Sequence, residues 1–160
     1  MERILLNNEL ELTCPDGFRS LDQEEMKKFT FANEQPGCVL ESEEQHMIVS
    51  LAWHRIGILL SLLFSPREMA GKMAEYIAKA DKDYNHRQGE FFDRTIDGSK
   101  ASGFDYSYTA QNIEMESRMI VAKRGRNLYC IYFYFRKALH QQSVQLMEEI
   151  ISSMSWKPVK

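Results

Sequence analysis

A run of apolar and aromatic residues near the carboxyl end, from Asn127 to Phe135, constrains the fold of this chain more than any other segment. Alternate side chains of a β-strand point to opposite faces of its sheet. One face would carry Leu128, Cys130, Tyr132 and Tyr134, and the other Tyr129, Ile131, Phe133 and Phe135. Neither face is polar, so the segment is predicted to be a central strand covered on both sides. Such a strand requires a three-layer domain.

The length and composition are those of an ordinary globular domain. The chain has 160 residues, of which 44% are hydrophobic and 27% are charged. A chain of this size can bury a sizeable core without disulfides or metals, so we expect one domain spanning residues 1–160. The net charge is −3, without the basic excess that nucleic-acid binding needs, so no nucleic-acid partner is expected. No motif indicates a cofactor.

The cysteines and the apolar segments indicate where in the cell the protein is expected. Cys14, Cys38 and Cys130 are odd in number and far apart, so reduced thiols in a cytoplasmic protein are the simplest interpretation. The polar amino terminus does not have the pattern of a signal peptide. The longest apolar stretch, Ile56 to Phe64, has nine residues, whereas a membrane-spanning helix needs roughly 20. No membrane insertion is predicted.

The remaining strands are predicted from alternation and from turn residues. Alternating apolar and polar side chains indicate strands at Glu9–Cys14 and His46–Arg55. The second half predicts an antiparallel meander of four segments: Phe91–Ile96, Ser102–Thr109, Met115–Lys123 and Asn127–Arg136.

Three helices are predicted from caps and periodicity. Ser20, with Gln23 three residues later, has the spacing of a capping box for a short helix. Ser65 and Pro66 begin a second helix, which extends to about Tyr84. Its predicted buried stripe is Met69, Met73, Tyr76, Ile77, Ala80 and Tyr84. The last helix is expected over residues 140–152.

No group of residues specifies a reaction. His46 and His54 lie about 26 Å apart on one predicted strand, so they cannot share an ion, and no His or Cys pair has the spacing of a zinc site. The chain has no G-x-S-x-G motif and no glycine pair spaced for a phosphate-binding loop. We therefore assign no catalytic and no metal-binding residue.

Charged residues inside the meander form the one constellation that could bind a small ligand. If the loop near residues 110–113 closes a hairpin, Asp105 and Arg118 lie nearly opposite one another. Such a pair either anchors a ligand or is a cross-strand ion pair worth roughly 0.2–1 kcal/mol. The ligand hypothesis expects a pocket between sheet and helix, lined by Tyr106, Tyr108, Tyr132 and Tyr134.

The apolar segment Ile56–Phe64 lies between a strand and a helix, where connections are usually polar. Two interpretations are open. The favoured one is a buried turn of helix that closes one end of the core. The other is an exposed patch that marks an interface with a partner or a second copy. Its candidate interface residues are Ile56, Leu59, Leu60, Leu63 and Phe64.

The chain also resembles a known superfamily. The opening strand ends in Pro15-Asp-Gly-Phe18, the segment Thr95–Tyr108 lies within the meander, and the aromatic strand is followed by a helix and Ser155-Trp156. Together these features resemble the Mog1/PsbP-like α/β/α sandwich superfamily. The resemblance implies an α+β fold with a curved antiparallel sheet of about six to seven strands and helices on both faces. It also implies a mostly non-catalytic role, and it assigns no functional residue.

Two functions follow as hypotheses. The leading one is a non-catalytic module, adaptor-like or chaperone-like, that binds a protein partner or itself. The alternative is a small-molecule-binding protein or enzyme that uses Asp105 and Arg118, with Tyr106 and Tyr108 in its pocket.

Overall fold

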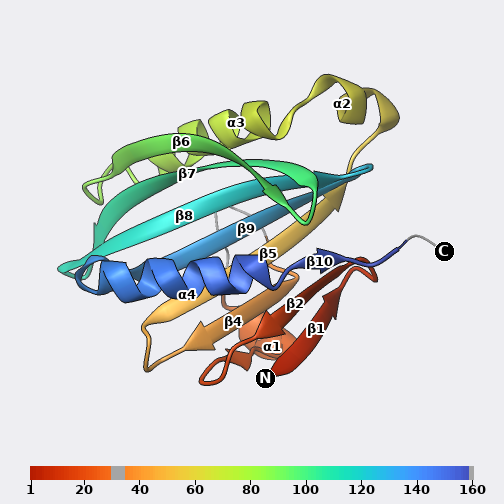
Figure 1. Cartoon of the computed structure of the whole chain (residues 1–160). Coiled ribbons are helices and arrows are strands. Elements are labelled where there is room, and N and C mark those ends of the chain that lie inside the picture. Colours follow the sequence, from red (N-terminus) through yellow and green to blue (C-terminus); the bar gives the residue numbers. More distant parts are fainter. Residues whose placement is uncertain (30–34, 159–160) are drawn as a thin grey trace.

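The computed structural model describes residues 1–29 and 35–158, which form two antiparallel sheets and four α-helices (Figure 1). The larger sheet has seven strands in the order β3-β4-β5-β9-β8-β7-β6. In chain order these strands are β3 (Arg19–Ser20), β4 (Cys38–Ser42), β5 (Met47–Arg55), β6 (Arg87–Ile96), β7 (Ser99–Ala110), β8 (Ile113–Arg124) and β9 (Asn127–Arg136). The smaller sheet contains β1 (Glu2–Leu6), β2 (Leu10–Cys14) and β10 (Ser155–Trp156). The helices are α1 (Gln23–Met26), α2 (Ile58–Leu63), α3 (Pro66–Ala80) and α4 (His140–Ser152).

Strand β9 lies at the centre of the larger sheet, between β5 and β8. Its two faces pack into two separate clusters. Leu128, Cys130 and Tyr132 lie in the cluster that includes Ala70, Ala74 and Ile77 of α3. The other face packs with Met147, Ile150 and Ile151 of α4 and includes Tyr129, Ile131, Phe133 and Phe135. The prediction of a central strand buried on both sides is confirmed.

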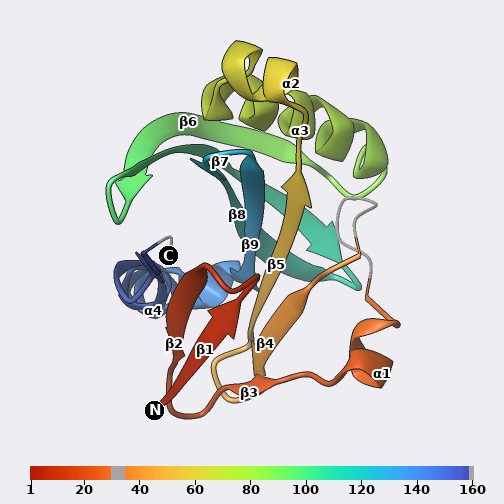
Figure 2. The ribbon, with the colours of Figure 1, turned by 90° about the vertical axis from the view of Figure 1, so that its right-hand side faces the viewer.

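The sheet is strongly curved, and its two faces are covered by different helices. Figure 2 shows β6 and β7 curling over, with α3 on the outer side of the curve and α4 on the inner side. The predicted fold class is therefore confirmed: an α+β sandwich with a curved sheet of seven antiparallel strands and helices on both faces.

The smaller sheet closes the inner core against α4. Alternate residues of β2, Leu10, Leu12 and Cys14, are buried, as the alternation predicted. Strand β10 pairs with β2 through Trp156 and Leu10, so the first and last strands belong to the same sheet. The indole of Trp156 donates to the carbonyl of Ile96 at 2.8 Å, which links this sheet to the last residue of β6.

The predicted cap of the first helix was wrong by two residues. Ser20 belongs to β3, because Leu21 is buried and its amide donates to the carbonyl of Val39. The N-cap is Asp22, whose carboxylate accepts from the amide of Glu25, while the Glu25 side chain accepts from the amide of Asp22. Two carboxylates therefore form the capping box that was expected from a serine and a glutamine.

Helix α3 begins at Pro66 with Ser65 as its N-cap, as predicted, but its buried stripe differs. Ala70, Ala74 and Ile77 face the sheet, with Met69 and Met73 packed at the edge. Tyr76, Ala80 and Tyr84 are exposed. The small alanines let the helix lie close to the aromatic face of the sheet, which large tyrosine rings at the same positions would prevent.

Candidate interaction site

Helix α2 is a short apolar helix between β5 and α3, with Gly57 as its N-cap and Phe64 as its C-cap. Its five aliphatic side chains are all exposed: Ile58 61%, Leu59 74%, Leu60 46%, Leu62 77% and Leu63 70%. We call these five residues the α2 patch. The buried member of the helix is Ser61, whose hydroxyl donates to the carbonyl of Ile58 at 2.7 Å.

The favoured prediction for this segment, a buried turn that closes the core, was wrong. Strand β5 ends at Arg55, and the following amide of Ile56 donates to the carbonyl of Arg126 at 2.8 Å. This bond carries the chain past the end of the sheet, and α2 projects beyond it (Figure 1). No core remains there for the helix to cover, so its side chains meet solvent.

Three of the five predicted interface residues are exposed in the structure. Leu59, Leu60 and Leu63 are exposed on α2, as the exposed alternative requires. Ile56 and Phe64 flank the helix and are half-buried. Sequence reasoning missed Ile58 and Leu62, although both belong to the same apolar run.

Basic side chains hold α2 through its backbone and its C-cap. The Lys123 ammonium donates to the carbonyl of Ser61, and Arg126 Nε donates to the carbonyl of Ile56 at 3.0 Å. Lys72 of α3 lies 4.4 Å from the centre of the Phe64 ring, within the range of a cation–π contact. The apolar side chains are thus presented outward by a helix that polar contacts keep in place.

A hollow of about 460 Å³ opens beside the patch. Leu62, Leu63 and Phe64 form its apolar side, and Lys100 and Lys123 contribute cations. The remaining lining residues are Ser65, Pro66 and Gly125. The site therefore combines a projecting apolar helix with a concave, positively charged flank.

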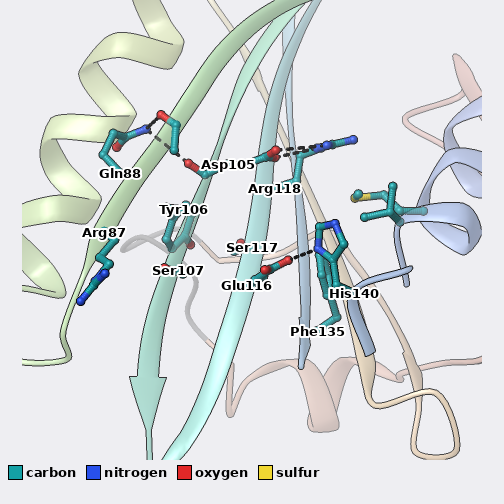
Figure 3. A pocket seen from close by; sticks show the side chains of 13 residues that line it. Arg87, Gln88, Asp105, Tyr106, Ser107, Glu116, Ser117, Arg118, Phe135 and His140 are labelled. Carbon is teal, nitrogen blue, oxygen red and sulfur yellow. Dashed lines mark hydrogen bonds and ion pairs between the residues drawn. The ribbon is translucent and has the colours of Figure 1, made fainter. Parts of the chain in front are cut away.

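The second candidate site is the Asp105–Arg118 pair on the inner face of the sheet (Figure 3). The two residues are direct partners in the β7–β8 ladder. Arg118 Nε donates to one carboxylate oxygen at 2.7 Å and Nη2 donates to the other at 3.1 Å. The predicted register was therefore correct, and the pair has the two-pronged geometry that a guanidinium and a carboxylate form best.

A third side chain, the carboxylate of Glu148 on α4, also binds Arg118. Glu148 accepts from Arg118 Nη1 at 3.0 Å and from Arg94 Nη1 at 3.0 Å. Burial alone would lower the pKa of Arg118, but its hydrogen bonds to Asp105 and the charges of Asp105 and Glu148 raise that pKa above its ordinary value. Sequence reasoning missed Glu148, because a glutamate on an amphipathic helix carries no local sign of its partner.

Of the four predicted tyrosines, Tyr106 alone lines the described cavity beside Asp105 and Arg118. Tyr106 and Tyr132 are buried in the cluster under α3, with Tyr108 and Tyr134 packed against it. Asp105 precedes Tyr106 and so faces the opposite side of the sheet. The cavity beside the ion pair measures about 230 Å³, and of the four tyrosines it includes Tyr106 alone. Drug-sized ligands usually occupy at least about 300 Å³.

The architecture is similar in fold to PsbP-like α/β sandwiches. The structure of cyanobacterial PsbP (CyanoP) from Synechocystis matches with a TM-score of 0.72 at 14% identity, over 98% of this chain and 92% of that one. LpqN of Mycobacterium tuberculosis, described as involved in cell envelope biogenesis, matches with a TM-score of 0.61 at 11% identity, over 93% of this chain and 83% of that one. The Mog1/PsbP-like resemblance is thus confirmed for the fold.

The comparisons by sequence add no family. No family model and no curated protein matches the chain. Within residues 1–29 and 35–158, none of the helices has the length and apolar character needed to cross a bilayer.

Proposed function

We propose that this chain is a single non-catalytic protein-binding domain whose contact surface is the α2 patch. One observation supports the proposal above all: five aliphatic side chains of α2 are exposed together. Burying one such side chain contributes roughly 1.5–3 kcal/mol, and this free energy remains available to a partner. Contiguous exposed apolar residues on a soluble domain are typical of protein interfaces.

The anchoring of α2 also supports the proposal. Ile56 and Ser61 are held through their carbonyl groups by Arg126 and Lys123, so the helix needs little further ordering on binding. A surface that is ordered beforehand loses less conformational entropy when a partner binds. Presenting the apolar face of a helix to a groove is a common mode of recognition between proteins.

The test is a double variant, Leu59→Ser with Leu62→Ser. We expect it to fold like the wild type, because both side chains are exposed, and to lose the partner or the self-association that the wild type shows in pull-downs and light scattering. The matched control is Leu5→Ser, which removes an exposed leucine of β1 outside the patch. A wild-type protein that is strictly monomeric and retains no partner would contradict the proposal, as would a variant that keeps every partner.

A second proposal retains Asp105, Arg118 and Tyr106 as a small-ligand site, without Tyr108, which lies under α3. It is supported by the cavity of about 230 Å³ beside the ion pair. A ligand there must compete with Asp105 and Glu148 for Arg118, so small carboxylic acids are the relevant probes. Binding should raise Tm in the wild type and not in Arg118→Met. No shift at millimolar concentrations of such acids would reject this site.

We also propose a cytoplasmic location. Cys14, Cys38 and Cys130 all lie in the described part of the chain, are buried and form no disulfide. Reduced cysteines are the usual state in a reducing compartment.

A further inference from the structure

Cationic side chains border the α2 patch. Lys100 and Lys123 line the hollow beside it, Lys72 lies over Phe64, and Arg126 is bound to the segment before the helix. We call Lys72, Lys100, Lys123 and Arg126 the basic collar. The whole chain carries a net charge of −3, so this concentration of positive charge is a local feature and does not reflect the average composition.

The collar retains its charge toward solvent. Among the described residues, none of the ion pairs involves any of its four members. Lys123 and Arg126 are bound to neutral carbonyl oxygens, which do not cancel a positive charge. The hollow has no carboxylate in its lining. Glu68, in the first turn of α3, instead accepts from the hydroxyl of Ser65 at 3.5 Å.

From this arrangement we infer that the α2 patch binds an acidic amphipathic segment of another protein, with apolar side chains on the patch and carboxylates against the collar. The inference rests on the proposed function and specifies the chemistry of the partner. Opposite charges around an apolar contact direct the encounter and exclude partners of the wrong sign. The acidic flanks of the partner would lie near Lys72 and Lys100, which are exposed.

A second copy of this chain does not provide such a surface at the same site. A two-fold symmetric contact places the same residues of both copies against each other. Two basic collars would then meet, and close like charges oppose association. The charge arrangement therefore favours a different protein over a symmetric dimer through α2.

A membrane surface also fits the site less well. Anionic lipids attract basic residues next to an apolar helix, but a bilayer presents no defined shape to the hollow beside α2. The hollow of about 460 Å³, with Leu62 and Leu63 on one side and Lys100 on its lining, instead suits protruding side chains of a folded or helical partner. Close shape complementarity is characteristic of protein interfaces.

The test uses two synthetic amphipathic helices of about 20 residues with the same leucine face. One carries glutamates on its polar face and the other carries lysines. Binding of each fluorescent peptide to the full chain is measured by anisotropy. We expect the acidic peptide to bind, with an affinity that falls as NaCl rises from about 50 to about 500 mM, and the basic peptide not to bind.

Two double variants separate the charges from the apolar patch. Lys72→Glu with Lys100→Glu reverses two exposed collar charges and should weaken acidic-peptide binding at least about fivefold. The matched control, Lys79→Glu with Lys82→Glu, changes the net charge equally at exposed positions outside the collar and should bind normally. Leu59→Ser with Leu62→Ser should abolish binding.

Three outcomes would overturn the inference. The first is equal or stronger binding of the basic peptide, and the second is a concentration-dependent dimer that Leu59→Ser with Leu62→Ser dissolves. The third is patch-dependent binding to phosphatidylcholine–phosphatidylglycerol vesicles without binding to the acidic peptide. The proposed function is separable from this inference. If the acidic peptide binds no better than the basic one, but Leu59→Ser with Leu62→Ser still loses its pull-down partner, the acidic partner is rejected and the proposed function stands.

Discussion

Arg118 joins three secondary-structure elements through one planar side chain. Its guanidinium donates to Asp105 on β7 and to Glu148 on α4, and it lies 5.1 Å from the centre of the Phe92 ring on β6. A guanidinium satisfies two carboxylates and stacks on a ring at once, whereas a lysine ammonium lacks this planar, forked geometry. Arg118 therefore connects α4 to β7 and β6, and Arg94 of β6 makes a second connection through Glu148.

We expect Arg118→Met to lower the free energy of unfolding by about 1–2 kcal/mol, because two neighbouring carboxylates would lose their shared counter-charge. The predicted loss of stability is modest because the Asp105 and Glu148 side chains are 45% and 42% exposed, so water screens their charges. Urea unfolding measures the change. Arg118→Lys should lower the free energy of unfolding by less. If Arg118→Met is as stable as the wild type, the ion-pair network makes no net contribution to stability.

At the scale of elements, β7 must bend to follow the curved sheet (Figure 2). Gly103, in its first half, sits against the neighbouring strand. A Cβ added there would lie 2.2 Å from the carbonyl oxygen of Met119 and 2.9 Å from the Phe92 ring. The backbone can approach this closely only because glycine has no side chain.

Gly103→Ala should therefore destabilise the protein by about 1–3 kcal/mol, the usual cost of overpacking. The measurement is thermal or urea unfolding. Gly71→Ala in α3 is the matched control: a Cβ there meets no atom within 4 Å, and alanine should stabilise the helix by about 0.5–1 kcal/mol. Equal effects of the two substitutions would contradict the close approach at β7.

At the scale of the whole molecule, buried tyrosines fill the layer between the sheet and α3. Burial raises the pKa of Tyr106 to about 12, and burial also raises the pKa of Tyr134 well above its ordinary value. Both hydroxyls must therefore stay neutral for the layer to remain packed.

This layer makes alkaline pH destabilising. A tyrosine in the unfolded chain ionises near pH 10, whereas Tyr106 in the folded chain ionises near pH 12. Its contribution to stability is thus fully present below about pH 10 and is lost as pH rises through 12. We expect Tm to fall over this range together with the appearance of tyrosinate absorbance. Tyr106→Phe should reduce the fall, whereas Tyr84→Phe, at an exposed position, should not.

The candidate sites were predictable only in part. The Asp105–Arg118 pair followed from the sequence, because turn residues set the register of the β7–β8 hairpin and register decides which residues are opposite. Glu148 did not follow, because α4 is distant in sequence and reaches Arg118 only through the packing of the helix on the sheet.

By itself, the sequence determined the central place of β9, the antiparallel meander and the periodic helices, because strand alternation and turn chemistry act over a few residues. Only the tertiary structure decided that the apolar segment before α3 stays in water. Whether leucines are buried depends on where neighbouring elements end, and the sheet ends before α2 begins. Tertiary packing also placed the buried tyrosines and the Asp105–Arg118 pair in different surroundings. The tyrosines lie on the sheet face that meets α3, and the ion pair lies on the face that meets α4.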